Sequence, residues 1–201
     1  MFQYAYGRSN FKDVAFDRSG IVPPRTYALD PFRLDIKFQD NSPDALSGYW
    51  QGEKYFCHDV VRSEFSKSNP LFEDTCFIGV RRSDYLLPER INYHGVMPIE
   101  YYDLAMSYVR ERVPNVKFVC FADDWQWAYD HFGLRAIHNG DATDIWLMAR
   151  CPYAIIANSS FHWWGAWLGP QNIVVAPKRW FATPNPSPDC LDIVPERWTR
   201  I

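Results

Sequence analysis

The sequence lacks the features that mark several large classes of protein. Its 201 residues contain no apolar run long enough to span a bilayer and no signal-peptide pattern. The formal net charge is −3, so no basic surplus is available to hold a polynucleotide, and no DNA- or RNA-binding motif occurs. We therefore expect a cytoplasmic protein that has no nucleic-acid partner and no transmembrane segment, and whose association with a membrane, if any, is peripheral.

Motifs for metal binding and for thiol chemistry are also missing. The five cysteines form no C-x-x-C pair, and Cys76 and Cys120 fall inside apolar runs. We expect reduced, buried thiols of a cytosolic protein rather than disulfides or zinc ligands. The five histidines show no metal-ligand spacing, and only His94, beside Gly95 ahead of a predicted helix, stands out from a purely structural role.

Aromatic residues, in contrast, are abundant. They make up 17% of the chain and include nine tryptophans. Such residues build cores, and their flat faces also suit the C–H surfaces of sugars, so composition leaves both interpretations open.

The C-terminal two-thirds of the chain alternates between apolar runs and helical patterns. The expected buried strands span 76–80, 118–122, 153–157 and 173–176. The expected helices span about 98–113, 125–132, 143–150 and, starting at Ser159 or Ser160, up to about 169. This alternation predicts an α/β fold with a parallel sheet and right-handed crossovers.

Two of these helices carry detailed signals. Pro98 suits the first turn of its helix, and Gly133 fits the position just after the end of the second one. One face of the first helix is expected to be buried, and it consists of Tyr101, Tyr102, Ala105, Met106 and Val109.

Residues 1–72 follow no such pattern, so we predict a smaller, less regular lobe over 1–72 and the parallel-sheet lobe over 73–201. Prolines interrupt this part of the chain, and 30–33 and 48–52 are typical of loops or turns. The opening residues 1–8 resemble the inside of an amphipathic helix with no strand before it. We therefore expect an N-terminal lobe that lacks its first strand and the loop after it.

The most informative motif is the pair Arg81-Arg82 at the end of the strand 76–80. In open α/β sheets, ligands collect beyond the carboxyl ends of the strands. Arginine is always charged, and its planar fork matches phosphate oxygens. One arginine can bind a diphosphate while the other pairs with Asp84 or another carboxylate and holds the loop; the alternative is a plain Arg–Asp salt bridge at the edge of the sheet.

Two adjacent carboxylates, Asp123 and Asp124, follow the next strand. They can bind Mg²⁺ or cap the following helix, whose N-terminus favours negative charge by roughly 0.3–1 kcal/mol. We favour capping, because no D-x-D motif of a metal-dependent sugar transferase occurs in the chain.

Two serines follow the strand 153–157. Ser159 and Ser160 stand at the start of a helix, where free backbone N–H groups form an anion site and the hydroxyls add hydrogen bonds. The alternative is a simple N-cap, which contributes about 1 kcal/mol. Since two anion-seeking features occupy neighbouring strand ends, a diphosphate such as that of a nucleotide-sugar fits, whereas neither a P-loop nor a G-x-G-x-x-G motif is present.

These motifs, taken in order, resemble glycosyltransferase family 11, the α-1,2-fucosyltransferases. The resemblance covers nearly the whole chain and is carried by residues 1–5, 48–56, 80–85, 121–127, 144–148 and 158–167. It implies a GT-B-like fold of two Rossmann-type lobes, with the donor site in 73–201 and the acceptor side in 1–72. The chain departs from the family pattern at Gly79, where the family has histidine, and at Met1, which the family's glycine-rich loop should precede.

The resemblance also implies an activity: inverting transfer of fucose from GDP-fucose to the 2-hydroxyl of a galactose-terminated glycan, without a metal or other cofactor. Alternatives are an impaired fragment that only binds GDP or glycan, and a transferase for another GDP-sugar.

The implied roles are specific. Arg81 would bind the β-phosphate and act in catalysis, with Ser159 and Ser160 on the same group, and Asp144 would bind the guanine edge. The loops would be held by Arg82, Asp84, Asp123 and Asp124. No residue is identified as the catalytic base, for which Asp84 and Glu53 are candidates on acidity alone.

Overall fold

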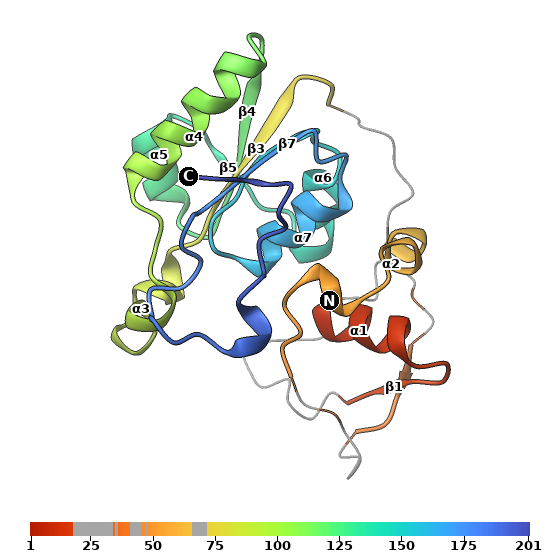
Figure 1. The fold of residues 1–201 in the computed structure, drawn as a ribbon. Coiled ribbons are helices and arrows are strands. Elements are labelled where there is room, and N and C mark those ends of the chain that lie inside the picture. Colours follow the sequence, from red (N-terminus) through yellow and green to blue (C-terminus); the bar gives the residue numbers. More distant parts are fainter. Residues whose placement is uncertain (18–33, 35, 41–45, 47, 66–71) are drawn as a thin grey trace. The chain divides into compact units, whose positions relative to one another are not determined.

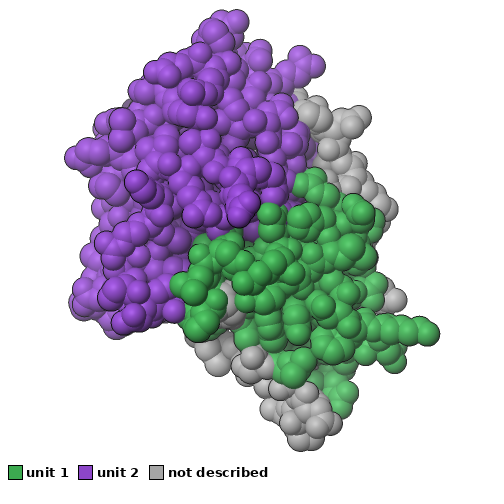
Figure 2. Space-filling model, viewed as in Figure 1, with its two compact units in different colours: residues 1–67, 187–193 green, residues 68–186, 194–201 purple. Residues whose placement is uncertain are grey.

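The computed structural model describes residues 1–17, 34, 36–40, 46, 48–65 and 72–201. The chain forms two compact units (Figure 2). The first comprises Met1–Lys67 and Ser187–Ile193, and the second comprises Ser68–Pro186 and Val194–Ile201. The segment Ser187–Ile193 thus belongs to the first unit. The predicted lobes, 1–72 and 73–201, place this segment in the second lobe.

The second unit is built on a six-stranded sheet in which every pair of neighbours is parallel (Figure 1). Its order is β5-β4-β3-β6-β7-β8. The strands are β3 (Thr75–Val80), β4 (Lys117–Ala122), β5 (Ala136–Ile137), β6 (Tyr153–Ile155), β7 (Ile173–Ala176) and β8 (Thr199–Arg200). The predicted parallel α/β sheet is confirmed. Strands β5 and β8 were not predicted, because each has only two residues and lies in no apolar run.

Helices connect these strands. The second unit contains η3 (Ser83–Leu86), α3 (Pro88–His94), α4 (Ile99–Arg112), α5 (Trp125–Phe132), α6 (Asp141–Met148) and α7 (Ser160–Leu168). The four predicted helices are confirmed within about two residues. Gly133 follows α5 with φ 67°, and its N–H donates to the carbonyl of Tyr129, which is the left-handed helix end that its position predicted.

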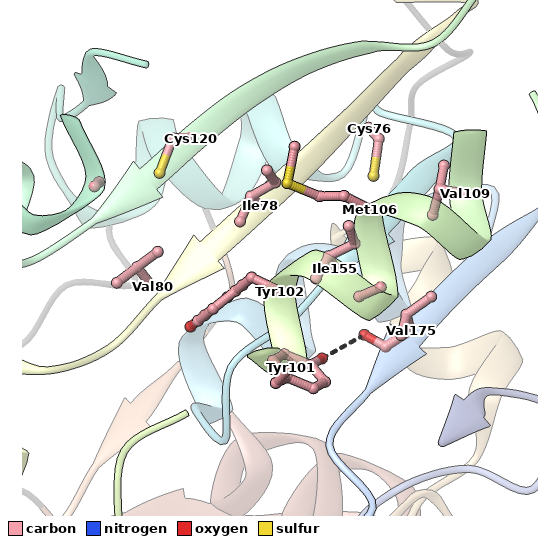
Figure 3. Packing of buried hydrophobic residues seen from close by; sticks show 12 residues of the cluster. Cys76, Ile78, Val80, Tyr101, Tyr102, Met106, Val109, Cys120, Ile155 and Val175 are labelled. Atoms are coloured by element: carbon pink, nitrogen blue, oxygen red, sulfur yellow. Dashed lines mark hydrogen bonds between the residues drawn. The ribbon is translucent and has the colours of Figure 1, made fainter. Parts of the chain in front are cut away.

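Helix α4 covers one face of the sheet. Its buried residues are Tyr101, Tyr102, Ala105, Met106 and Val109, as the helical pattern predicted. They pack on side chains that β3 sends to that face, Cys76, Ile78 and Val80 (Figure 3). The Tyr101 hydroxyl donates to the carbonyl of Ile156 at 2.7 Å, so even the polar atom inside this core is satisfied.

Helices α6 and α7 pack against each other elsewhere in the unit. Trp163, Trp164 and Trp167 of α7 are almost fully buried, which confirms their interpretation as helix packing rather than sugar platforms. Close approach of the two helices depends on Gly165, where an added Cβ would lie 2.7 Å from the Cβ of Met148.

The first unit contains short elements. They are α1 (Phe2–Asn10), β1 (Ala15–Phe16), β2 (Lys37–Phe38), η2 (Glu53–Tyr55), α2 (His58–Phe65) and η4 (Pro188–Cys190). The predicted opening helix is present as α1, where Tyr4 packs on Phe16 and Phe65 with ring centroids 5.2 and 5.5 Å apart. Residues 48–52 form neither helix nor strand, as expected, whereas the predicted loop at 30–33 lies outside the described residues.

All five cysteines are free, and four of them are buried. Burial raises the pKa of Cys120 and Cys151 to about 12, so these thiols stay protonated and unreactive. The expectation of buried thiols is wrong for Cys57, which is exposed just before α2. Within the described ranges, no helix is both long and apolar enough to cross a membrane.

Candidate active site

Arg81 directly follows β3, and its guanidinium contacts two carboxylates and one aromatic ring. Its guanidinium pairs with Asp84, which follows in the same loop, and its Nη1 lies 3.0 Å from Oδ2 of Asp123 beyond the end of β4. The guanidinium also lies over the ring of Tyr85, 5.0 Å from its centroid. The side chain keeps 31% of its surface exposed, so a ligand can still reach this preorganised arginine.

Arg82 has a different environment. Its Nε lies 3.5 Å from Oδ2 of Asp124, and its guanidinium lies 4.4 Å from the ring centroid of Trp127. Its backbone N–H donates to Oδ1 of Asp123 at 2.8 Å. These contacts connect the loop after β3 to the start of α5, in line with the holding role that the sequence suggested for Arg82.

Asp84 is shared by two arginines. One of its oxygens pairs with Arg81 and the other with Arg90 of α3. Sequence reasoning missed Arg90, because α3 was not predicted and the pairing occurs through space. Three arginines (Arg81, Arg82, Arg90) thus meet three aspartates (Asp84, Asp123, Asp124), and their formal charges balance.

Helix α5 begins with a carboxylate cap. Asp124 is its N-cap residue, and Oδ1 accepts a hydrogen bond from the backbone N–H of Trp127 at 3.1 Å. This is the capping interaction that the sequence favoured for the adjacent acids. Among the described residues, no three His, Cys, Asp or Glu side chains come together as a set of metal ligands.

Helix α7 begins differently. Ser159 is its N-cap residue, but it makes no side-chain capping bond, and the first turn contains no acidic residue. Ser159 is buried and Ser160 is exposed. The first backbone N–H groups of α7 therefore keep their capacity to bind an anion, with the Ser160 hydroxyl beside them.

Arg81 lies within electrostatic reach of this first turn. Burial, and next the positive charge of Arg81, lower the pKa of His162, in the first turn of α7, to about 3. Gly79 of β3 lies directly against His162 of α7. Because residues two apart on a strand point to the same face of the sheet, Arg81 is expected on the face that α7 covers. Arg81 and the start of α7 thus belong to one region beyond the carboxyl edge of the sheet.

Asn158 ties together the loops at this edge. It is buried, and its Nδ2 donates to the carbonyls of His94 at 2.8 Å and Trp180 at 3.0 Å. The Tyr85 hydroxyl donates to the carbonyl of Asn158 at 3.4 Å, and the Tyr85 ring stacks on that of His94 at 4.3 Å. These contacts connect the loops that follow β3, β6 and β7. The linking role of Asn158 was not predicted, and the signal for it in the sequence was an asparagine directly after the predicted strand 153–157.

Asp144 lies in the first turn of α6, after β5 at the end of the sheet. It is buried, and Oδ1 accepts from the backbone N–H and the side-chain Nδ2 of Asn139 at 3.0 and 3.3 Å. Oδ2 lies 3.5 Å from Nδ1 of His138. Both oxygens of this buried carboxylate therefore already have partners just before α6, and the contact of Asp144 with guanine stays a prediction.

The two candidate bases lie in different units. Both oxygens of Asp84 are paired with arginines in the second unit, and Glu53 lies in η2 of the first unit with one oxygen 3.7 Å from Nε2 of His58. The contacts of the described residues do not favour either of them as a base.

The parallel six-stranded sheet and the helices that connect its strands are consistent with a GT-B-like glycosyltransferase. The chain belongs to glycosyl transferase family 11, whose model matches residues 32–201. The resemblance seen in the sequence is therefore confirmed.

Two relatives from Escherichia coli are similar to the chain. It is 32% identical to an alpha-1,2-colitosyltransferase in an alignment of 179 positions that covers 77% of this chain and 61% of that protein. It is 36% identical to the O-antigen biosynthesis glycosyltransferase WbnK in an alignment of 130 positions that covers 59% of this chain and 43% of that protein. The chain thus spans about half the length of these relatives, and no solved structure is significantly similar to it.

Proposed function

We propose that this chain is an inverting glycosyltransferase that moves L-fucose, or a closely related deoxy sugar, from its GDP derivative to the 2-hydroxyl of a galactoside. The proposal is supported by two features near the carboxyl edge of the sheet: Arg81 follows Gly79, which lies against His162 of α7, and the first turn of α7 has no side-chain cap. A guanidinium and a row of backbone N–H groups together suit a diphosphate, which is the leaving group of a nucleotide-sugar. The family and the name of the colitosyltransferase favour transfer in α-1,2 linkage.

The chemistry requires stabilisation of the leaving group. As the bond from the sugar to the β-phosphate breaks, negative charge grows on the phosphate oxygens. Arg81 and the N-terminus of α7 would stabilise that charge more strongly in the transition state than in the ground state. Asp84 and Asp123 hold the Arg81 guanidinium in place beforehand, so that little reorganisation is needed when the charge develops.

The two units would divide the work. The second unit would bind the GDP-sugar, with Arg81, Ser159 and Ser160 at the diphosphate and Asp144 at the guanine. The first unit would face the acceptor, and its residues 48–52 present two aromatic side chains, Tyr49 and Trp50, of which Tyr49 is 60% exposed. The reaction would need no metal, since arginine and helix N–H groups take the role of a cation.

Calorimetry with GDP, followed by transfer assays with GDP-fucose and lactose, tests the proposal. We expect GDP to bind and fucosyl-lactose to form at equal rates with EDTA and with Mg²⁺. Binding of GDP without transfer or donor hydrolysis would support the alternative of a fragment that only binds ligand. A protein that binds no GDP would overturn the proposal.

The sugar is decided by a second assay. Because the relative is named for colitose, the GDP derivatives of fucose and colitose should be compared at equal concentration. We expect fucose to be preferred, and a preference for colitose would change the donor while leaving the diphosphate site unaffected.

A further inference from the structure

The imidazole of His162 fills the space that a side chain at position 79 would occupy. Gly79 is the second-last residue of β3, and His162 lies in the first turn of α7. A Cβ added to Gly79 would lie 2.4 Å from Cγ, 2.6 Å from Nδ1 and 2.7 Å from Cδ2 of the imidazole. No side chain tolerates contacts this short, so the ring rests directly on the backbone of β3 and depends on the glycine beneath it.

The imidazole has little freedom to move away. His162 is only 3% exposed, and the backbone of Phe121 on β4 lies close enough to influence the pKa of the ring. Phe121 is the partner of Gly79 in the β3–β4 register, so the ring spans two adjacent strands. Its Nδ1 is buried and has no hydrogen-bond partner among the described residues, which is unusual for a residue kept only for packing.

This contact lies between the two halves of the anion site. Ser160 is two residues before His162 on α7, and Arg81 is two residues after Gly79 on β3. We propose that His162 is a positioning residue, whose imidazole fills the space above Gly79 and so fixes the first turn of α7 against β3, with Ser160 and Arg81 directed at one phosphate group. The identity of the anion as a diphosphate rests on the proposed function, whereas the fit of His162 on Gly79 does not depend on it.

Position 79 is where the chain departs from the family motif. The glycine is the opening that the ring from α7 requires. A ring from α7 and a side chain at position 79 exclude each other, since both would fill the same volume.

Four variants separate positioning from plain packing, with the Kd for GDP and the melting temperature as paired readouts. Gly79→Ala pushes against the imidazole and should weaken GDP binding by about tenfold, because a shift of the helix start misplaces its N–H groups. His162→Ala removes the ring and should weaken GDP binding by roughly fivefold. The double variant should bind GDP within about twofold of His162→Ala, because the added methyl then has room.

Gly165→Ala is the matched control. It adds the same methyl group to the same helix, but against Met148 of α6 rather than against the imidazole. It should lower the melting temperature and leave the Kd for GDP within about twofold of the parent value. If Gly79→Ala and Gly165→Ala lower the melting temperature alike and neither changes the Kd, His162 is a packing residue and the proposal is wrong.

Inorganic pyrophosphate is the second probe. If the parent protein binds pyrophosphate but not GDP, the proposed function fails, and the same four variants test the positioning on pyrophosphate alone. If Gly79→Ala is insoluble, the comparison of His162→Ala with the double variant decides, because additive losses would contradict a shared space. A parent protein that binds neither probe overturns both proposals.

Discussion

Helices α5 and α7 begin at equivalent places in the fold, but the chemistry of their first turns is opposite. Each follows a strand of the parallel sheet, and each begins just beyond the carboxyl edge. Asp124 closes the start of α5 by accepting from the N–H of Trp127, whereas Ser159 leaves the start of α7 without a side-chain bond.

The comparison shows which helix start is available to a ligand. A capped N-terminus has already used its positive end on a carboxylate of its own chain, and adding an anion would bring two negative charges together. An open N-terminus keeps that potential. The acids beside Arg81 and Arg82 belong to the closed side of this edge, so the phosphate is expected at α7.

The largest expected effect comes from removing the arginine that completes the open site. Arg81→Ala should lower kcat/KM for the GDP-sugar by about 10²–10³, the usual consequence of losing one preorganised contact to a developing charge. Arg81→Lys should also be poor, because a point charge cannot replace the planar fork. Steady-state kinetics on the active protein measure both changes.

Arg112→Ala is the control for charge. Arg112 is the last residue of α4, where the chain turns back toward the start of β4, and so lies at the opposite edge of the sheet. It should leave kcat/KM within about twofold of the parent value. Near-normal turnover in Arg81→Ala would refute the role assigned to Arg81.

The histidines of the two helices should contribute differently to the pH dependence of stability. Helix α7 contains His162, whose pKa is lowered from 6.5 to about 3 by burial and by Arg81. Below pH 6.5 the unfolded chain takes up a proton that the folded protein refuses, so stability falls on acidification. Between pH 8 and pH 5 this residue should account for about 2 kcal/mol of lost unfolding free energy.

Urea denaturation of the parent protein and of His162→Asn at both pH values measures this difference. The variant should lose less stability on acidification than the parent protein. His131→Asn, at an exposed position of α5, is the matched control. Equal pH dependence in the parent protein and His162→Asn would contradict the burial of a neutral ring in α7.

Closing the open helix should weaken ligand binding. Ser160→Asp places a carboxylate in the first turn of α7, as at the start of α5, and should raise helix stability by roughly 0.3–1 kcal/mol. The same charge should weaken GDP binding by about tenfold, measured by calorimetry. Ser160→Ala, which removes the hydroxyl without adding charge, should change the affinity less, and an unchanged Kd in Ser160→Asp would place the anion elsewhere.

The smallest effect is expected from opening the closed helix. Asp124→Ala removes the cap of α5 and should lower the unfolding free energy by about 1 kcal/mol. Asp124→Asn keeps an acceptor at the same place and should lose less. The Kd for GDP should hardly change in either variant, and a large loss of affinity would show that α5 shares in the site.

The main strands and helices of the second unit could be predicted because each has its own local signal. The apolar runs of β3 and β4 and the stripe of α4 from Tyr101 to Val109 are periodic over enough residues to stand out. Strands β5 and β8 are too short for any period, since each is defined only by its hydrogen bonds to a neighbour.

The site was only partly predictable for a related reason. Arg81 and the serines of α7 stand at strand ends, which a sequence pattern can locate. The pairing of Arg90 with Asp84 and the fit of His162 on Gly79 join residues from different elements, and no residue type or spacing records them. Through-space partners of this kind emerge only when the chain is folded.

The return of Ser187–Ile193 to the first unit has a practical consequence for dissecting the protein. In that unit, Asp192 pairs with Lys54 at 2.9 Å, and Cys190 and Ile193 are almost fully buried. If the chain were cut once near residue 68, the C-terminal fragment would keep Ser187–Ile193 without the rest of the first unit. The side chains of Cys190 and Ile193 would then be exposed to solvent on that fragment. Independent production of the sheet-bearing half therefore calls for splicing Pro186 to Val194 through a neutral linker.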